Sequence, residues 1–158
     1  MKQIDISNQL EPVNITLSSE SEQIEVVGSF LVAHGEKKEV VVTIVHAVPH
    51  TSAKITLRGV VFGGGYLSIR GKILVEKNAF HTDSFLKEEI LLCDETAKAE
   101  AIPNLEIQSD DVKCSHASSI SLVSSQHLHF LQSRGIAKDV ALNLLIQGFL
   151  HTPQEKTA

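Results

Sequence analysis

Residues 55–61 read ITLRGVV, and residues 67–73 read LSIRGKI. Both stretches alternate apolar residues with other residues, and both carry an arginine directly before a glycine. The same frame without the arginine occurs in residues 24–30, and a partial copy, which also lacks the glycine, occurs in residues 105–111. A period of two residues is that of a strand with one buried face, so the recurring frame predicts short β-strands. The first two stretches start 12 residues apart.

The wider pattern favours strands that stack. Between the copies of the frame, residues 39–45 and 90–92 form nearly continuous apolar runs, which are typical of strands covered on both faces. Short strands that recur up to about residue 112 without helices between them favour a β-helix or β-solenoid, in which each rung buries its inward residues against its neighbours. A β-sandwich of short strands fits the same pattern, so alternation alone leaves both architectures open.

The pattern changes to that of helices near residue 124. Ser124 is one of two adjacent serines that can cap a helix over residues 126–132, and Gly135 suits the position after its end. A second helix is predicted over residues 138–150. This helix is apolar on nearly all sides, so either its own chain covers it or it leaves an apolar surface for a partner.

Length and composition set the broad class of the protein. A chain of 158 residues suits one compact domain, here divided into a β-helix core over residues 1–123, a helical subdomain over 124–152 and a polar tail over 153–158. A net charge of −5 disfavours nucleic acid as a partner. No apolar run approaches the ~20 residues of a membrane span. We therefore expect a cytoplasmic protein without a membrane partner, or one of an organellar stroma if the source carries plastids.

Few side chains form a recognisable chemical motif. The sequence contains no P-loop, HExxH, GxSxG or CxxC pattern, and the glycine run over residues 63–65 is predicted to be a turn. His46 and His50 are weak candidates for metal binding, because Pro49 between them argues against a helix that would put them on one face. Cys93 is a further weak candidate, with no motif spacing to the second cysteine.

Residues 113–116, KCSH, form the more informative cluster. In an extended segment Cys114 and His116 point the same way, and a thiolate beside an imidazole suits iron or zinc. Lys113 is placed to lower the pKa of the Cys114 thiol. Two ligands do not hold a cluster, so a second subunit would have to supply the others. In the alternative interpretation Cys114 is a small core residue and His116 a hydrogen-bonded polar one.

Two long blocks carry a family resemblance. Residues 103–116, which include the strings PNLEI and DDVKCSH, resemble the C-terminal part of the SufB/SufD family of iron–sulfur cluster assembly scaffolds. The likeness continues through FLQSRGI at residues 130–136 and through residues 141–149. It covers about residues 40–150 and is closer to the SufD side of the family, because of the KCSH string.

The resemblance implies a right-handed parallel β-helix followed by a small helical subdomain, and a scaffold that is not itself an enzyme. It implies pairing with a SufB-like subunit or with a second copy of the chain, and docking of a SufC-like ABC ATPase on the C-terminal helices. By position, His116, with Cys114 as its neighbour, would help to build a transient iron–sulfur cluster at the subunit interface. The expected ATPase-docking residues are Phe130, Arg134, Gly135, Ala141, Leu145 and Phe149.

The sequence also departs from the family. Familiar members are much longer, so by comparison we expect fewer rungs here, and an open end of the solenoid would need a partner or a second copy to cover it. His50 stands where asparagine is common, and Ala117 replaces a frequent glycine. A β-solenoid interaction module that has kept the interfaces and lost the cluster chemistry is therefore the alternative function.

Overall fold

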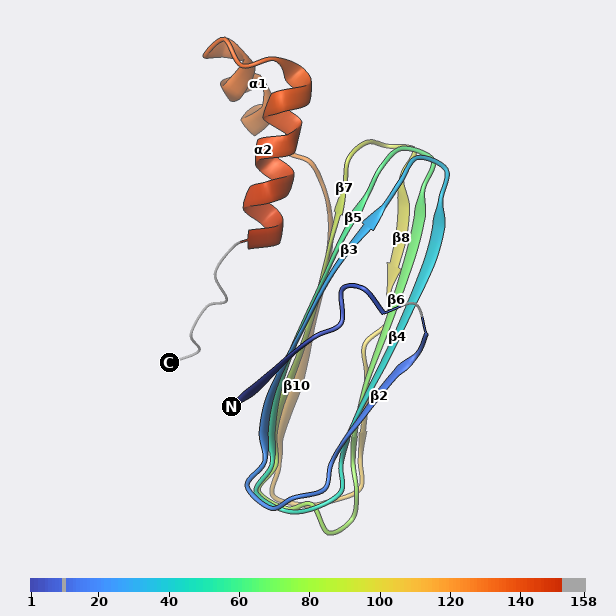
Figure 1. Ribbon diagram of the computed structural model, residues 1–158, viewed down its shortest axis with the longest axis vertical. Helices are drawn as coiled ribbons and strands as arrows, with labels where there is room; N and C mark the ends of the chain where they lie inside the picture. The colour runs from blue at the N-terminus through green and yellow to red at the C-terminus, as the bar shows by residue number, and fades with distance from the viewer. Residues whose placement is uncertain (10, 152–158) are drawn as a thin grey trace.

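The computed structural model describes residues 1–9 and 11–151, so the predicted tail over residues 153–158 lies outside the described part (Figure 1). Strands come first and two helices follow them. The strands are β1 (Lys2–Asp5), β2 (Val13–Leu17), β3 (Gln23–Val32), β4 (Lys37–His46), β5 (Ser52–Val61), β6 (Tyr66–Val75), β7 (Asp83–Leu92), β8 (Lys98–Ala101), β9 (Asn104–Ile107) and β10 (Lys113–Leu122). The helices are α1 (Ser125–Ser133) and α2 (Lys138–His151).

The strands belong to two parallel sheets that the chain visits in turn. Sheet A has the order β1-β3-β5-β7-β10, and sheet B has the order β2-β4-β6-β8, with β9 also paired to β6. The register aligns Gln23 with Ser52, Ser52 with Asp83, and Asp83 with Lys113. The result is a β-solenoid of about four turns, which confirms the predicted β-helix. The alternative β-sandwich is excluded, because such sandwiches are antiparallel.

The 12-residue spacing in the sequence is not the period of the solenoid. Residues 55–61 lie in β5 of sheet A, whereas residues 67–73 lie in β6 of sheet B, so the two copies belong to opposite sheets and do not pair. The strands stacked on β5 are β3 and β7, each about 30 residues away along the chain. Of the partial copy over residues 105–111, only the beginning is a strand, namely the end of β9.

Aliphatic side chains fill the space between the sheets. Along β3, Ile24, Val26 and Phe30 are buried and alternate with residues of the outer face. Among the buried residues that the structure describes, Phe30 is the one phenylalanine, which agrees with the aromatic content of only 4% in the sequence. The prediction that the apolar run over residues 39–45 is covered on both faces is wrong, because its outer residues are only half-buried.

The corners of the solenoid repeat a strained backbone position. Ser21, His50, His81 and Asp111 each lie two residues before a strand of sheet A, with φ between 55° and 63°. Successive corners are joined by backbone hydrogen bonds, for example from His81 N–H to the Asp111 carbonyl at 2.8 Å. The predicted glycine turn between β5 and β6 is confirmed, and Gly64 has the φ of +71° that favours glycine.

The two helices form a hairpin beside one end of sheet A (Figure 1). Ser124 is the N-cap of α1, and its side chain accepts a hydrogen bond from His127 N–H, as predicted. Ile146 of α2 packs against Val60 and Leu91, which lie on the outer face of sheet A. Only one side of α2 is covered in this way. Neither helix is long and apolar enough to cross a membrane.

Candidate functional site

The last turn of the solenoid leaves the inner face of β10 open. In the same turn sheet B contributes only the short strands β8 and β9, which Ile102 and Pro103 separate. Every residue of β10 is exposed except Cys114, which is half-buried. Ile120 and Leu122 are 44% and 48% exposed, although the register places Ile120 beside the fully buried Ile90 of β7. A free sheet edge with an uncovered apolar face is suited to pairing with another chain.

Cys114 and His116 lie on this open face. The register aligns Cys114 with Ser84 and His116 with Leu86, two buried residues that point into the solenoid. The prediction that the two side chains share one side of an extended strand is therefore confirmed. Cys114 packs at the edge of the core, whereas His116 is exposed.

The environment of Cys114 keeps its thiol protonated. Burial raises the pKa of the thiol above its ordinary value, and the Asp83 carboxylate raises it further. A hydrogen bond with the Ser84 backbone acts in the opposite direction without reversing the shift. The expectation that Lys113 lowers this pKa is wrong, because Lys113 is not among the groups that act on the thiol. Loss of the proton would therefore accompany metal binding at Cys114.

Cys93 lies apart from Cys114, on the other face of sheet A. It packs with Val60 and Ile146 in the contact between the sheet and α2. Burial raises the pKa of its thiol to about 11, and the charge of Asp94 adds to the shift. The two cysteines therefore do not contribute to one metal site within a single chain.

His46 is a residue of the core. It is fully buried, its Nδ1 lies 2.8 Å from Thr51 Oγ1, and its Nε2 lies 3.1 Å from Ser84 Oγ. Burial lowers its pKa to about 4, so the ring is neutral at neutral pH. Both ring nitrogens are already engaged, which disfavours the predicted metal-binding role.

His50 occupies a surface corner and does not meet His46 in a shared site. Its ring lies beside that of His81, with 4.9 Å between the ring centres, and His81 Nδ1 lies 2.9 Å from Asp111 Oδ2. No group of three or more His, Cys, Asp or Glu side chains in the described residues is arranged to hold a metal ion.

The six expected docking residues separate into an exposed group and a covered group. Phe130, Arg134 and Gly135 are exposed, and the Arg134 guanidinium lies 5.1 Å from the centre of the Phe130 ring. Ala141 is fully buried. The other two, Leu145 and Phe149, are half-buried and pack towards sheet A with Val60 and Leu91.

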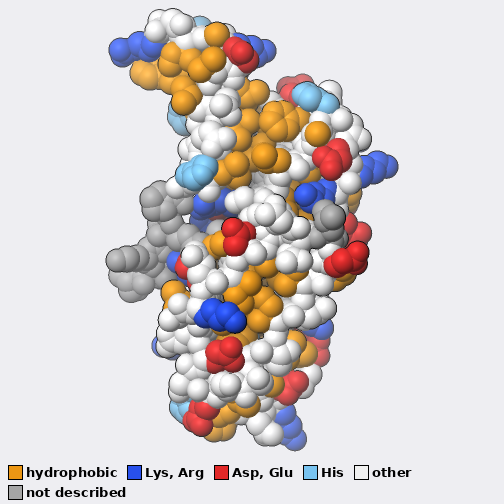
Figure 2. Space-filling view, viewed as in Figure 1, with side chains coloured by type: hydrophobic (Ala, Val, Ile, Leu, Met, Phe, Trp, Pro, Cys, Tyr) orange, Lys and Arg blue, Asp and Glu red, His pale blue; other side chains and the backbone are white. Residues whose placement is uncertain are grey.

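The helices expose two further apolar residues that the sequence interpretation did not select. Val140 and Leu144 are 50% and 49% exposed and lie four residues apart, which puts them on one face of α2. Figure 2 shows hydrophobic side chains gathered on the helical hairpin and on the neighbouring part of the solenoid. The apolar stripe that contains Val140 and Leu144 is visible in the sequence. The stripe does not by itself show which side of α2 the sheet covers.

Glu88 is a second residue that sequence reasoning missed. It is fully buried, and its Oε1 accepts a hydrogen bond from Gly71 N–H at 2.8 Å, whereas its Oε2 has no partner among the described residues. Gly71 faces the gap between β8 and β9, so no neighbouring strand uses its N–H. Burial raises the pKa of Glu88 to about 7. The alternation of the strand could have predicted that Glu88 points inward, because it lies two residues from Leu86 and two from Ile90, both of which are buried.

Known proteins share this region of sequence. Residues 5–149 match the SufBD core domain of the SUF system for iron–sulfur cluster assembly. A SufBD family iron–sulfur cluster assembly protein of Mycobacterium leprae is 31% identical over 136 residues, which are 86% of this chain and 16% of that protein. The SufB protein of Bacillus subtilis is 28% identical over 120 residues, which are 76% of this chain and 26% of that SufB protein.

A SufBD family protein of Staphylococcus epidermidis is 25% identical over 137 residues, covering 87% of this chain and 30% of its own length. The chain thus spans less than a third of each of these relatives. Because the domain match extends from the first strand to the second helix, this chain belongs to the SufBD family of iron–sulfur cluster assembly proteins.

Proposed function

We propose that this chain is a non-enzymatic scaffold for iron–sulfur cluster assembly. The observation that supports this best is the open inner face of β10, which presents Cys114 and His116 together at a free sheet edge. A thiolate and an imidazole are suitable ligands for iron. One chain offers only this pair, so the nascent cluster, as cargo, takes its other ligands from a second subunit.

The second subunit in this proposal is a SufB-like chain or another copy of this one. Its strands would add to the free edge of β10, where backbone hydrogen bonds supply affinity and side chains supply specificity. Such pairing would also cover Ile120 and Leu122, which are about half exposed in the single chain. His116 would then lie at the interface instead of facing solvent.

The helical hairpin is the proposed docking site for a SufC-like ABC ATPase. Of the predicted residues, Phe130, Arg134 and Gly135 are accessible, and Val140 and Leu144 extend the exposed apolar area. ATP-driven movement of the bound ATPase would shift the scaffold between a state that hides the ligands on β10 and a state that exposes them.

Docking is tested by capture of a purified SufC-like ATPase on the immobilised chain. We expect the double substitution Phe130→Ser and Leu144→Ser to weaken capture at least tenfold, because both side chains are about half exposed on the hairpin. Ile107→Ser is the matched control, since Ile107 is 44% exposed but lies on β9. Equal capture by the double variant and the control would refute docking at this surface.

The cluster site is tested by anaerobic reconstitution with iron and sulfide of the complex between this chain and its SufB-like partner. We expect His116→Ala to lower bound iron and sulfide severalfold. His129→Ala, which removes another exposed histidine from α1, should leave both unchanged. Unchanged content in the His116 variant would remove this residue from the proposed ligand set.

The alternative function is an interaction module that assembles with partners and carries no cluster. Its support is the scarcity of ligands, because the sequence has two cysteines and the structure places them in different clusters on the two faces of sheet A. This alternative predicts normal assembly of the wild-type complex without iron after reconstitution, whereas the scaffold function predicts iron and sulfide in it.

A further inference from the structure

The helical hairpin is attached to the solenoid near one end only. No residue of α1 is buried, and at the beginning of α2 Val140 is half exposed. The attachment comes from the other end of α2, where Ile146 is 4% exposed against sheet A. An open surface pocket of about 210 Å³ lies at the joint, between β7, the end of β10 and both helices. The packed contacts between the hairpin and sheet A come from the part of α2 that begins at Leu142.

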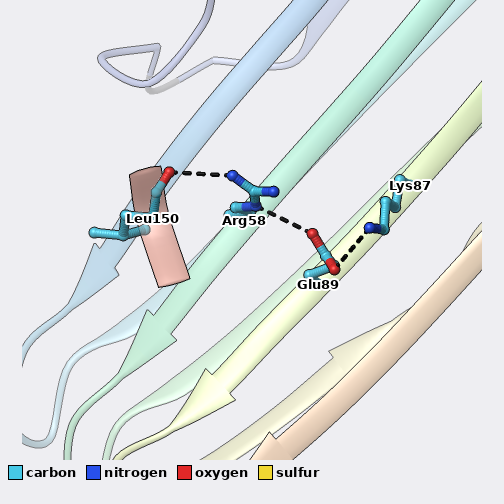
Figure 3. A network of polar contacts seen from close by, with 4 residues as sticks. All are labelled: Arg58, Lys87, Glu89 and Leu150. Atoms are coloured by element: carbon cyan, nitrogen blue, oxygen red, sulfur yellow. Dashed lines mark hydrogen bonds and ion pairs between the residues drawn. The ribbon is translucent and has the colours of Figure 1, made fainter. Parts of the chain in front are cut away.

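Arg58 makes a polar contact across this joint (Figure 3). It projects from the outer face of β5 and is only 8% exposed. One guanidinium N–H donates to the carbonyl oxygen of Leu150 at 3.1 Å, and Nε–H donates to Glu89 Oε2 at 3.1 Å. Glu89 lies directly opposite Arg58 on β7, and its other oxygen is 2.9 Å from Lys87 Nζ.

The charges in this contact complement the end of the helix. Leu150 is the second-last described residue of α2, so its carbonyl lies in the last described turn, toward the negative end of the helix dipole. A planar guanidinium can bond this carbonyl and a carboxylate at the same time. Burial tends to raise the pKa of Glu89, but hydrogen bonds from Lys87 and Arg58 outweigh it and lower the pKa, so Glu89 stays ionised.

The same joint includes the end of β10. Val123, the residue that follows β10, is 8% exposed and packs in one cluster with Ile146 of α2. Ser124 then caps α1 directly. A movement of α2 away from sheet A would therefore disturb the packing of Val123, which directly follows the strand that carries His116.

We propose that Arg58 is a positioning residue that fastens the C-terminal end of α2 to sheet A and thereby holds the hairpin and the end of β10 in one arrangement. If the hairpin is the ATPase-docking site, as proposed above, the Arg58–Leu150 contact is the fastening that a docked ATPase must work against to move β10. The fastening itself does not depend on that function and can be measured in the chain alone.

The sequence offers a matched control for Arg58. Arg70 is also an outward arginine directly before an inward glycine, and it pairs with Glu39 at 3.4 Å. Its side chain is 54% exposed, and β6 belongs to sheet B, which contributes no described residue to the cluster around Ile146 of α2. Substitution of either arginine by glutamine removes the same charge, but of the two arginines it is Arg58 whose described contacts include a helix.

The test is amide hydrogen exchange of the whole chain without any partner. We expect Arg58→Gln to speed exchange in residues 142–151 and in residues 119–123 at least tenfold, with β3 and β4 unchanged. Arg70→Gln should leave all of these segments unchanged. Arg58→Lys should restore part of the protection, because lysine keeps the charge and loses the fork of donors. If Arg58→Gln does not fold, Glu89→Gln replaces it and should give a smaller acceleration in the same two segments.

Three results would overturn the inference. Unchanged exchange in residues 142–151 would show that Arg58 does not fasten the helix, and equal acceleration by Arg70→Gln would show that charge alone matters. Acceleration of α2 without any change in residues 119–123 would refute the link to β10. Failure of the wild-type chain to bind an ATPase would refute the proposed docking and leave the exchange result standing.

Discussion

The segments Arg58–Gly59 on β5 and Arg70–Gly71 on β6 share one local sequence and differ in almost every contact. In both, the arginine points outward and the glycine points into the core. Arg58 is 8% exposed because α2 covers the outer face of sheet A. The Arg70 side chain is 54% exposed, because no described helix covers sheet B. The same Arg-Gly pair thus contacts a helix in sheet A, whereas in sheet B its arginine lies at the surface.

The two glycines also make room for different neighbours. A Cβ on Gly59 would overlap a methyl group of Leu67, whereas a Cβ on Gly71 would lie 2.6 Å from Glu88 Oε1 and 2.7 Å from Leu86 Cδ2. The first glycine therefore admits an aliphatic side chain from the opposite sheet. The second admits a carboxylate and donates a hydrogen bond to it. An inward glycine in this fold shows that another side chain lies close to the backbone at that position. The neighbouring sequence does not show which side chain this is.

The largest expected effect within this comparison is that of Gly71→Ala. The new methyl group would clash with two buried side chains, at a cost of about 1–3 kcal/mol for overpacking. It would also displace Glu88 from its hydrogen bond, at a further cost of about 1–3 kcal/mol. Urea unfolding should show the sum as a lower free energy of unfolding. A loss below about 1 kcal/mol would mean that the core relaxes around the methyl group.

The second prediction concerns pH and the carboxylate beside Gly71. The pKa of Glu88 is raised to about 7, so the stability that it contributes is full below pH 4.5 and is lost as the pH rises through 7. The pKa of His46 is lowered to about 4, so its contribution is present above pH 6.5 and is lost as the pH falls through 4. The two contributions oppose each other between pH 4.5 and 6.5, and the wild-type stability should change little there.

Glu88→Gln should expose the histidine contribution. Glutamine keeps an oxygen for Gly71 N–H and does not titrate, so the free energy of unfolding should rise by roughly 3 kcal/mol from pH 4 to pH 6.5, at about 1.36 kcal/mol for each unit of pKa shift. Denaturant midpoints at several pH values measure this, and His46→Gln should give the opposite slope. If the free energy of unfolding changed with pH in the same way in wild type and in Glu88→Gln, the titrations of Glu88 and His46 would not oppose each other.

Gly59→Ala should cost less than Gly71→Ala. Its methyl group would meet Leu67 and would disturb no hydrogen-bonded charge, so only the overpacking cost of about 1–3 kcal/mol applies. Leu67→Ala alone should cost about 2–5 kcal/mol because it leaves a cavity in the core. The loss in the double variant should be smaller than the sum of the two single losses, because the new methyl group no longer meets Leu67. The double variant, measured by thermal unfolding, separates overlap with Leu67 from a general intolerance of β5 to alanine.

The smallest expected effect is that of Arg70→Gln. Exposed ion pairs contribute about 0–1 kcal/mol, so its free energy of unfolding should lie within about 0.5 kcal/mol of wild type. Addition of salt should reduce even this difference. A loss above about 1 kcal/mol would show that the Arg70–Glu39 pair does more than its exposure suggests.

Part of the candidate site could be predicted because it depends on local geometry. Alternation along a strand is enough to place Cys114 and His116 on one side of β10, and the structure agrees. Alternation would also have placed Glu88 inward. The separation of His46 from His50 could not be predicted in this way, because it depends on which residues line the core at the corner between two sheets.

The sequence by itself indicated most of the long strands, both helices and a mainly β class, while the alternation left a solenoid and a sandwich open. Their signals are short-range: a period of two residues, the serine that caps α1, the glycines at turns and an aliphatic composition that suits stacked rungs. Only the tertiary structure decided that the 12-residue spacing links opposite sheets, that α2 covers sheet A, and that Arg58 and not Arg70 meets a helix. These outcomes depend on residues about 30 to 90 positions apart, and a local pattern carries no information about contacts at that range.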